Sequence, residues 1–178
     1  MIALKRPMYG PSDPHRLNTR IGLHYGDIFL GNIGGGDHYQ HSVMGDIVNT
    51  ASRIEGLNKH LGTRVLVSAE VVEQLGGLLT RELGSFRLKG KTKPIGIHEL
   101  ICRTEAADGK QREACGYFAD GLAAFRKRSW DEAMGKFRRS MEILGEDEPS
   151  RFYLEVCEQH KANPPGETWD GVVNMDMK

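Results

Sequence analysis

The sequence predicts an α+β fold, in which a layer of strands and helices is followed by a small helical segment. Three observations support this prediction. Residues 20–103 alternate between strand and helix patterns in the order ββαβαββ, which is typical of a mixed sheet covered by helices. Residues 104–112 are charged and poor in large apolar side chains, so we expect a linker there. Residues 113–163 have helical periodicity in three segments with short turns between them.

The composition is that of an ordinary soluble globular protein. Of its 178 residues 39% are hydrophobic and 27% charged, and the net charge is zero. A neutral chain has no global field that would draw it to nucleic acid or to an anionic membrane. No apolar run is long enough to span a bilayer, and the three cysteines form no metal or disulfide pattern. We therefore expect a cytoplasmic protein without a membrane segment.

The N-terminal part is expected to hold two strands. Residues 1–19 contain three prolines and little periodicity, and we expect an irregular lead-in there. Residues 20–34, RIGLHYGDIFLGNIG, alternate apolar with other residues on both sides of Gly26 and Asp27, a pair suited to a two-residue turn. This pattern predicts a β-hairpin. Residues 34–42, GGGDHYQHS, are expected to form a loop.

The next helix is expected to begin at Asp46, a plausible N-cap, and to end before Gly62. One stripe of this helix is apolar and predicts its buried face: Ile47, Val48, Ala51, Ile54, Leu57 and Leu61. Asn49 and Arg53 lie one turn apart on the opposite side. A short buried strand, a short helix capped by Ser68, and two strands joined at KGKTKP, residues 89–94, are expected to follow.

Two apparent motifs are rejected, and the pair formed by Asn49 and Arg53 is weak evidence when it stands alone. GSFRLKGKT resembles a P-loop but has five residues between its glycines where four are required. The histidines at positions 24, 38, 41, 60 and 98 have no spacing that commits them to a metal ion. An asparagine and an arginine one turn apart are also common on an ordinary solvated helix.

Three motifs in one order resemble the class III nucleotidyl cyclases, the family of adenylate and guanylate cyclases. RIGLHYGDIFLGNIG is similar to their central hairpin, HSVMGDIVNTASRIEGLN to their substrate-facing loop and helix, and FRLKGKTKPIGIHEL to their last two strands. The similarity runs without gaps over residues 20–101. It implies a ferredoxin-like catalytic domain of an enzyme that converts ATP to 3′,5′-cyclic AMP and pyrophosphate.

The resemblance assigns roles to five residues. Asn49 would orient the ribose, and Arg53 would donate its forked N–H groups to the triphosphate as negative charge develops there. Lys89 matches the family's triphosphate-binding lysine, and Lys91 is near enough to share that task. Ser42 lies where the family reads the purine, and its hydroxyl favours adenine. Without the other motifs, a solvated strand edge would be the better interpretation of the lysines, and Ser42 would be an ordinary loop residue.

The family's metal ligands have no counterpart in this sequence. In the family, two aspartates in the N-terminal half of the domain hold two Mg²⁺ or Mn²⁺ ions, one in a DIxGFT-like strand and one after a GD pair. Asp27 and Asp46 belong to the later motifs, so no metal ligand is assigned here. We therefore expect the C-terminal half of a catalytic domain that lacks its N-terminal strands, binds no metal ion and is inactive as this chain.

The family acts as head-to-tail dimers. The resemblance implies that one subunit supplies the metal ions, the purine reader and Lys89, while the other supplies Asn49 and Arg53. A half-domain would leave a sheet edge and an apolar face uncovered, so we expect a homo-oligomer, most simply a homodimer.

The helical segment, residues 113–163, is similar to a tetratricopeptide-like helix pair with Trp130 opening the second helix, and residues 164–178 form a tail. It has fewer repeats than a free solenoid needs, so we expect it to pack on the cyclase layer or on a second chain. Similar helices and a WDG tail follow the catalytic domain of some membrane-anchored bacterial cyclases, which would place the parent's catalytic region in the cytoplasm. Two functions stay open: part of an adenylate cyclase in intracellular signalling, and a non-catalytic oligomerisation or interaction module derived from one.

Overall fold

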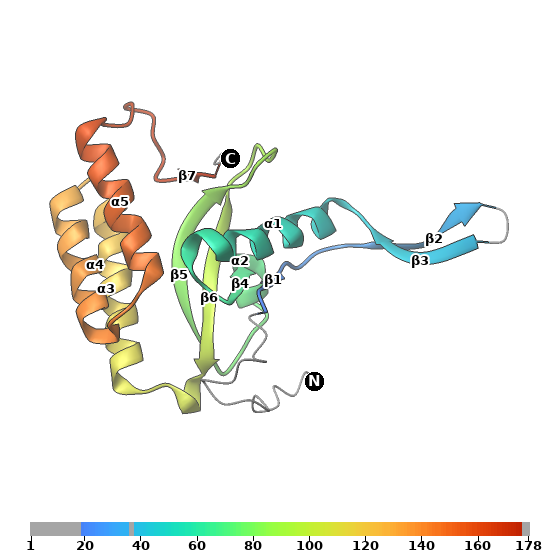
Figure 1. The fold of residues 1–178 in the computed structure, drawn as a ribbon, viewed down its shortest axis with the longest axis horizontal. Helices are drawn as coiled ribbons and strands as arrows, with labels where there is room; N and C mark the ends of the chain where they lie inside the picture. Colours follow the sequence, from blue (N-terminus) through green and yellow to red (C-terminus); the bar gives the residue numbers. More distant parts are fainter. Residues whose placement is uncertain (1–18, 36–37, 176–178) are drawn as a thin grey trace.

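The computed structural model describes residues 19–35 and 38–175 and has the mixed α+β architecture that the sequence predicts (Figure 1). In chain order its elements are β1 Ile21–Leu23, β2 Phe29–Gly35, β3 His38–Met44, α1 Asp46–Leu61, β4 Val65–Ser68, α2 Ala69–Val72, β5 Leu78–Arg87, β6 Ile95–Arg103, a 3₁₀ turn Thr104–Ala106, α3 Gly109–Arg126, α4 Trp130–Leu144, α5 Glu148–Ala162 and β7 Val173–Asn174.

The central sheet has five strands in the order β1-β4-β6-β5-β7. Strands β1 and β4 run parallel, as do β5 and β7, whereas β6 is antiparallel to both of its neighbours. Strands β2 and β3 form a separate two-stranded sheet. This hairpin projects away from the rest of the molecule as a long arm (Figure 1).

The prediction of a hairpin over residues 20–34 is wrong. Strand β1 instead enters the central sheet, with Ile21 opposite Val65, and the main-chain N–H of Ile21 donates to the carbonyl oxygen of Arg64. Strand β2 pairs with β3, and most of β3 forms from residues that the sequence predicts as a loop. Alternating apolar residues indicate a strand but do not indicate which strand it pairs with. The partner of β1 is β4, which follows α1 in the sequence.

Helix α1 buries the predicted apolar stripe at Ile54, Leu57 and Leu61. Gly62 ends it in the left-handed conformation at φ 63°, as predicted, but Gly45 rather than Asp46 is its N-cap. The side chain of Asn58 fixes the helix to β1, because Nδ2 donates to the carbonyl oxygen of Ile21 at 3.0 Å.

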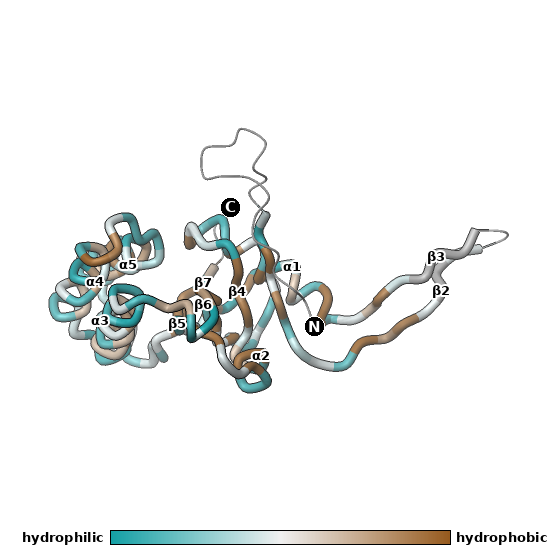
Figure 2. Tube along the Cα trace, turned by 90° about the horizontal axis from the view of Figure 1, so that it is seen from below, coloured by the Kyte–Doolittle hydropathy of each residue, from teal (hydrophilic) through white to brown (hydrophobic). Residues whose placement is uncertain are grey.

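The three C-terminal helices pack on the sheet, which confirms one of the two alternatives expected for them. They lie beside β5 in both views (Figures 1 and 2) and share one hydrophobic core with α1 and the sheet. The buried Tyr153 hydroxyl donates to the carbonyl oxygen of Leu83 at 2.5 Å, and a Cβ at Gly84 would lie only 2.4 Å from that hydroxyl. Helix α3 begins at Gly109, inside the expected linker, because Asp108 and Gln111 form a capping box. No helix in the described part of the chain is long and apolar enough to cross a bilayer.

Candidate functional site

Arg53 and Lys89 are brought together by α1 and by the turn between β5 and β6. They line one shallow cavity of about 180 Å³. Its lining residues are Arg53, Gly56, Leu57, His60, Leu88, Lys89 and Met175. Pockets that enclose a whole small molecule usually measure about 300–1,000 Å³. This cavity therefore suits one end of a ligand, such as a phosphate chain, rather than a complete nucleotide.

The Arg53 guanidinium lies against the β5–β6 turn at Gly90. A Cβ at that position would lie 3.3 Å from Nη1 and 3.4 Å from Nη2, and Gly90 itself has a φ of 69°. Within the described residues, the buried Nη1 atom of Arg53 has no hydrogen-bond partner. Buried polar groups are nearly always paired, so this N–H is well suited to donate to an anionic ligand.

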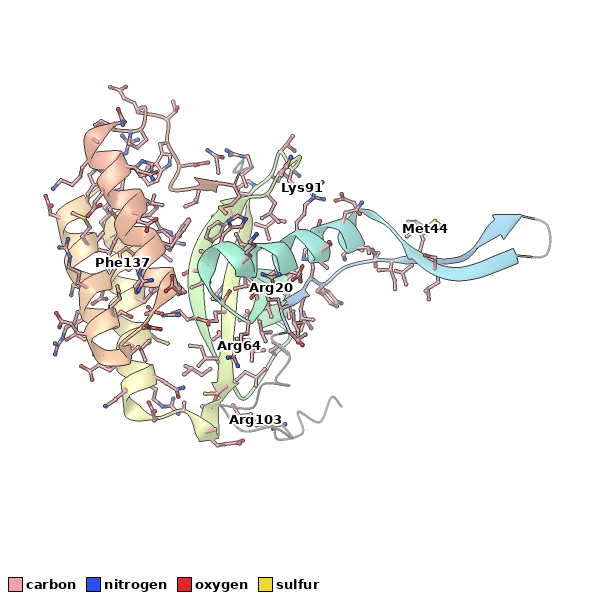
Figure 3. All side chains as sticks on the ribbon, viewed as in Figure 1. Arg20, Met44, Arg64, Lys91, Arg103 and Phe137 are labelled. Atoms are coloured by element: carbon pink, nitrogen blue, oxygen red, sulfur yellow. The ribbon has the colours of Figure 1, made fainter. Side chains whose placement is uncertain are left out.

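Lys91 lies at the same turn but is already paired. Its side chain is labelled at this turn in Figure 3, and its ammonium forms an ion pair with the carboxylate of Asp46, the first residue of α1. The hydrogen bond from Lys91 lowers the pKa of Asp46 below its usual value. Lys91 thus neutralises Asp46, and Arg53 and Lys89 are the arginine and lysine that line the cavity.

Asn49 and Ser42 do not line this cavity. Asn49 is exposed on α1, one turn before Arg53. Ser42 lies on β3, opposite Gly31, in the projecting hairpin. Their roles in binding the ribose and reading the purine remain predictions that rest on the resemblance.

The expected division of labour between subunits stays a prediction. The resemblance implies that Lys89 and Arg53 act from different subunits of a dimer. In the structure both residues line the same cavity of one chain. The two residues therefore lie close together within one chain.

The sequence did not single out two further lining residues, His60 and Met175. His60 lies seven residues after Arg53, so helical periodicity places both on one side of α1 and could have predicted it. Met175 lies far along the chain, and strand β7 brings it to the cavity. No local signal predicts that contact.

The chemistry of the lining residues suits an anion and does not fit a metal ion. Two cations line the cavity, and no carboxylate is among its lining residues. Within residues 19–35 and 38–175, no group of three or more His, Cys, Asp or Glu side chains could hold a metal ion. Two of the histidines considered as metal ligands have other surroundings. Nδ1 of His24 lies 2.9 Å from Oγ of Ser68, and burial lowers the pKa of His98. The side chains of His38 and His41 lie outside the described residues.

Several known proteins are similar to this chain. Residues 4–101 match the model of the adenylate and guanylate cyclase catalytic domain. Adenylate cyclase 1 of Rhizobium meliloti (strain 1021) is 42% identical over 84 residues, which are 47% of this chain and 13% of that protein. The terminal-differentiation-specific adenylate cyclase of Dictyostelium discoideum is 26% identical over 155 residues, which are 81% of this chain and 7% of that protein. The matches thus span less than a fifth of the length of these two relatives.

Two solved structures are also similar to part of the chain. A bacterial light-regulated adenylyl cyclase is 28% identical over 46% of this chain and 40% of its own, with a TM-score of 0.40. The adenylyl cyclase CyaB from P. aeruginosa is 23% identical over 50% of this chain and 45% of its own, with a TM-score of 0.41.

Proposed function

Because the chain belongs to the family of adenylate and guanylate cyclase catalytic domains, we propose that it supplies the triphosphate- and ribose-binding part of an adenylate cyclase site. The observation that carries this proposal is the cavity shared by Arg53 and Lys89, together with the lack of a hydrogen-bond partner for Nη1 of Arg53 among the described residues. Two cations at a cavity large enough for a phosphate chain are what a triphosphate requires.

The reaction places negative charge where these residues can meet it. The 3′ oxygen of the ribose forms a bond to the α-phosphorus and loses its proton, and the bond from that phosphorus to the bridging oxygen breaks. Pyrophosphate leaves with that oxygen, so charge grows on the leaving group and on the oxygens of the α-phosphate. Arg53 and Lys89 donate to these oxygens, and loss of one such preorganised donor costs about 2.7–4 kcal/mol of transition-state stabilisation.

ATP is the proposed nucleotide. The Ser42 hydroxyl favours adenine, and the curated relatives described above are named adenylate cyclases. Since the lining residues do not fit a metal ion, Mg²⁺ or Mn²⁺ would have to be held by another surface of the assembled enzyme. In this proposal the chain binds and orients the substrate, and it is inactive by itself.

A second copy of the chain is the proposed partner. Nine of the eleven exposed large hydrophobic residues in the described part of the chain fall between Ile21 and Val48. The most exposed of them are Phe29 at 75% and Leu30 at 63%, both at the base of the projecting arm. The apolar stretches of β2 and β3 are visible as brown segments (Figure 2). Apolar surface gathered in this way is typical of a protein–protein interface.

Formation of cyclic AMP tests the proposal. The chain is assayed alone and mixed with a class III cyclase domain that keeps its metal-binding aspartates but has Ala at its own positions matching Asn49 and Arg53. We expect no product from either protein alone and cyclic AMP from the mixture. Arg53→Ala should abolish this gain, whereas Arg64→Ala, which alters an exposed arginine at a different cavity, should preserve it.

The same assay separates the two candidate functions. If the two proteins associate and the mixture still makes no cyclic AMP, the chain is a non-catalytic interaction module. The apolar arm would then be its functional surface.

A further inference from the structure

The C-terminal segment 169–175 is anchored at its start by aromatic packing. The Trp169 ring lies 5.2 Å from Phe125, 5.5 Å from Trp130 and 5.3 Å from His160, measured between ring centroids. Its indole N–H donates to the carbonyl oxygen of Val172 at 3.2 Å. These contacts fix the segment to the C-terminal helices, so its other end has a defined position.

The far end of the segment adds strand β7 to the edge of β5. The main-chain N–H of Met175 donates to the carbonyl oxygen of Arg87 at 3.0 Å. The Arg87 side chain returns the contact, since Nη1 donates to Oδ1 of Asn174 at 2.7 Å. Its Nε also donates to the carbonyl oxygen of Thr92 at 3.3 Å. Arg87 therefore links the C-terminal strand to the turn that carries Lys89.

Met175 also forms part of the cavity itself. It is 8% exposed and lines the cavity together with Arg53 and Lys89. The segment thus reaches the cavity in two ways. The Met175 side chain lines it, and Arg87 joins Asn174 to the turn that carries Lys89.

We propose that strand β7 positions Lys89 for the phosphate chain, with Asn174 as the positioning residue that acts through Arg87. This inference rests on the proposed function, because it assumes that Lys89 binds phosphate. A lysine is flexible, and ordering its side chain and its turn opposes binding. A turn that is held in place before the ligand arrives lowers that cost.

The test measures the affinity of the 178-residue chain for inorganic tripolyphosphate by titration calorimetry. Asn174→Ala removes the side-chain acceptor of Arg87 Nη1 without changing charge, while the pairing of Arg87 with Thr92 and Asp170 is kept. Asn163→Ala is the matched control, since Asn163 is exposed at the end of α5. Arg53→Ala reports on the phosphate site itself. Amide hydrogen exchange is followed in residues 88–93 and in α3–α5 of each variant.

We expect Asn174→Ala to weaken tripolyphosphate binding about fivefold, the typical effect of one net hydrogen bond. Exchange should accelerate in residues 88–93 only, and Asn163→Ala should match the unchanged chain. Unaltered affinity in Asn174→Ala together with lost affinity in Arg53→Ala would overturn the inference and leave the proposed function standing. Faster exchange throughout α3–α5 would also overturn it, because β7 would then merely stabilise the fold. No Arg53-dependent binding in the unchanged chain would refute the proposed function and this inference together.

Discussion

Gly90 decides how closely the lysine-rich turn approaches Arg53. Its φ of 69° is one that residues with a side chain rarely adopt, and the guanidinium occupies the space beside it. Gly77 has nearly the same φ, 70°, but open space where a Cβ would be. Substitutions at the two positions can therefore be compared. Both introduce backbone strain, but only a substitution at Gly90 also meets the Arg53 guanidinium.

Both Gly90→Ala and Gly77→Ala should lower the free energy of unfolding by about 1–2 kcal/mol, because both force alanine into the left-handed region. Only Gly90→Ala should also weaken ATP binding, since its new methyl group displaces the Arg53 guanidinium. Urea denaturation and titration calorimetry measure the two effects. Equal ATP affinity in both variants would show that the position of Arg53 does not matter for the nucleotide.

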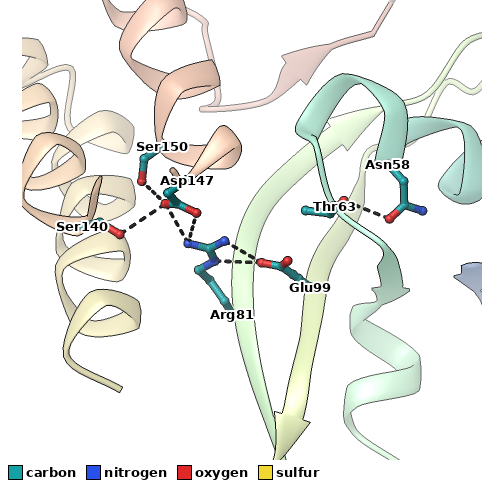
Figure 4. Close-up of polar contacts among 7 residues, drawn as sticks. All are labelled: Asn58, Thr63, Arg81, Glu99, Ser140, Asp147 and Ser150. Atoms are coloured by element: carbon teal, nitrogen blue, oxygen red, sulfur yellow. Dashed lines mark hydrogen bonds and ion pairs between the residues drawn. The ribbon is translucent and has the colours of Figure 1, made fainter. Parts of the chain in front are cut away.

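Among the elements, the C-terminal helices are joined to the sheet by a buried polar cluster (Figure 4). Arg81 of β5 donates from Nη1 to Asp147, which precedes α5, and from Nη2 to Glu99 of β6 at 2.6 Å. Asp147 also accepts hydrogen bonds from Ser140 and Ser150. The ionic partners Arg81 and Asp147 are 6% and 4% exposed. Loss of either charge would leave the other poorly paired in the interior.

Asp147→Asn should therefore lower the free energy of unfolding by about 3 kcal/mol, the low end for a broken buried pair, because Glu99 still pairs with Arg81. Asp131→Asn is the control. Asp131 pairs with Lys161 at the surface, and such pairs contribute about 0–1 kcal/mol. Urea denaturation compares them, and equal losses would mean that the cluster does not join the helices to the sheet.

The helices were predictable because their signals are local. The Gly62 terminus of α1, the start of α4 at Trp130 and the buried half of the α1 stripe are in place, whereas Val48 of that stripe is exposed. The strand pairings were less predictable. No local pattern indicates that β1 pairs with β4 or that β7 pairs with β5. A prediction from local patterns therefore joined β1 to β2 by mistake.

The candidate site likewise contains residues that the sequence predicted and contacts that it did not. Arg53 and Lys89 were predicted from motifs in α1 and in the β5–β6 turn, and the structure brings them to one cavity. Met175 was not predicted, because it depends on the pairing of β7. The pairing of Lys91 with Asp46 was not predicted either, since their contact depends on how the turn packs on α1.

At the scale of the whole molecule, the apolar arm should make the chain a homodimer. Light scattering during size-exclusion chromatography at micromolar concentration should give about twice the 19.9 kDa of one chain. Phe29→Glu should shift the mass towards one chain, because a charge in an apolar interface is costly. Leu75→Glu is the control, since Leu75 is also exposed but lies just after α2, away from the arm. A self-sufficient monomer of the unchanged chain would refute the dimer.

In the proposed site, Arg53 and Lys89 of a single chain bind the triphosphate of ATP. Titration calorimetry of ATP into the purified chain tests it most directly, with Arg53→Ala, Lys89→Ala and the control Arg64→Ala measured alongside. We predict that the unchanged chain and Arg64→Ala bind ATP, that tripolyphosphate competes, and that Arg53→Ala and Lys89→Ala each lose about tenfold or more in affinity, as expected when a charged hydrogen bond is removed. Equal ATP affinity in all four proteins would contradict the claim.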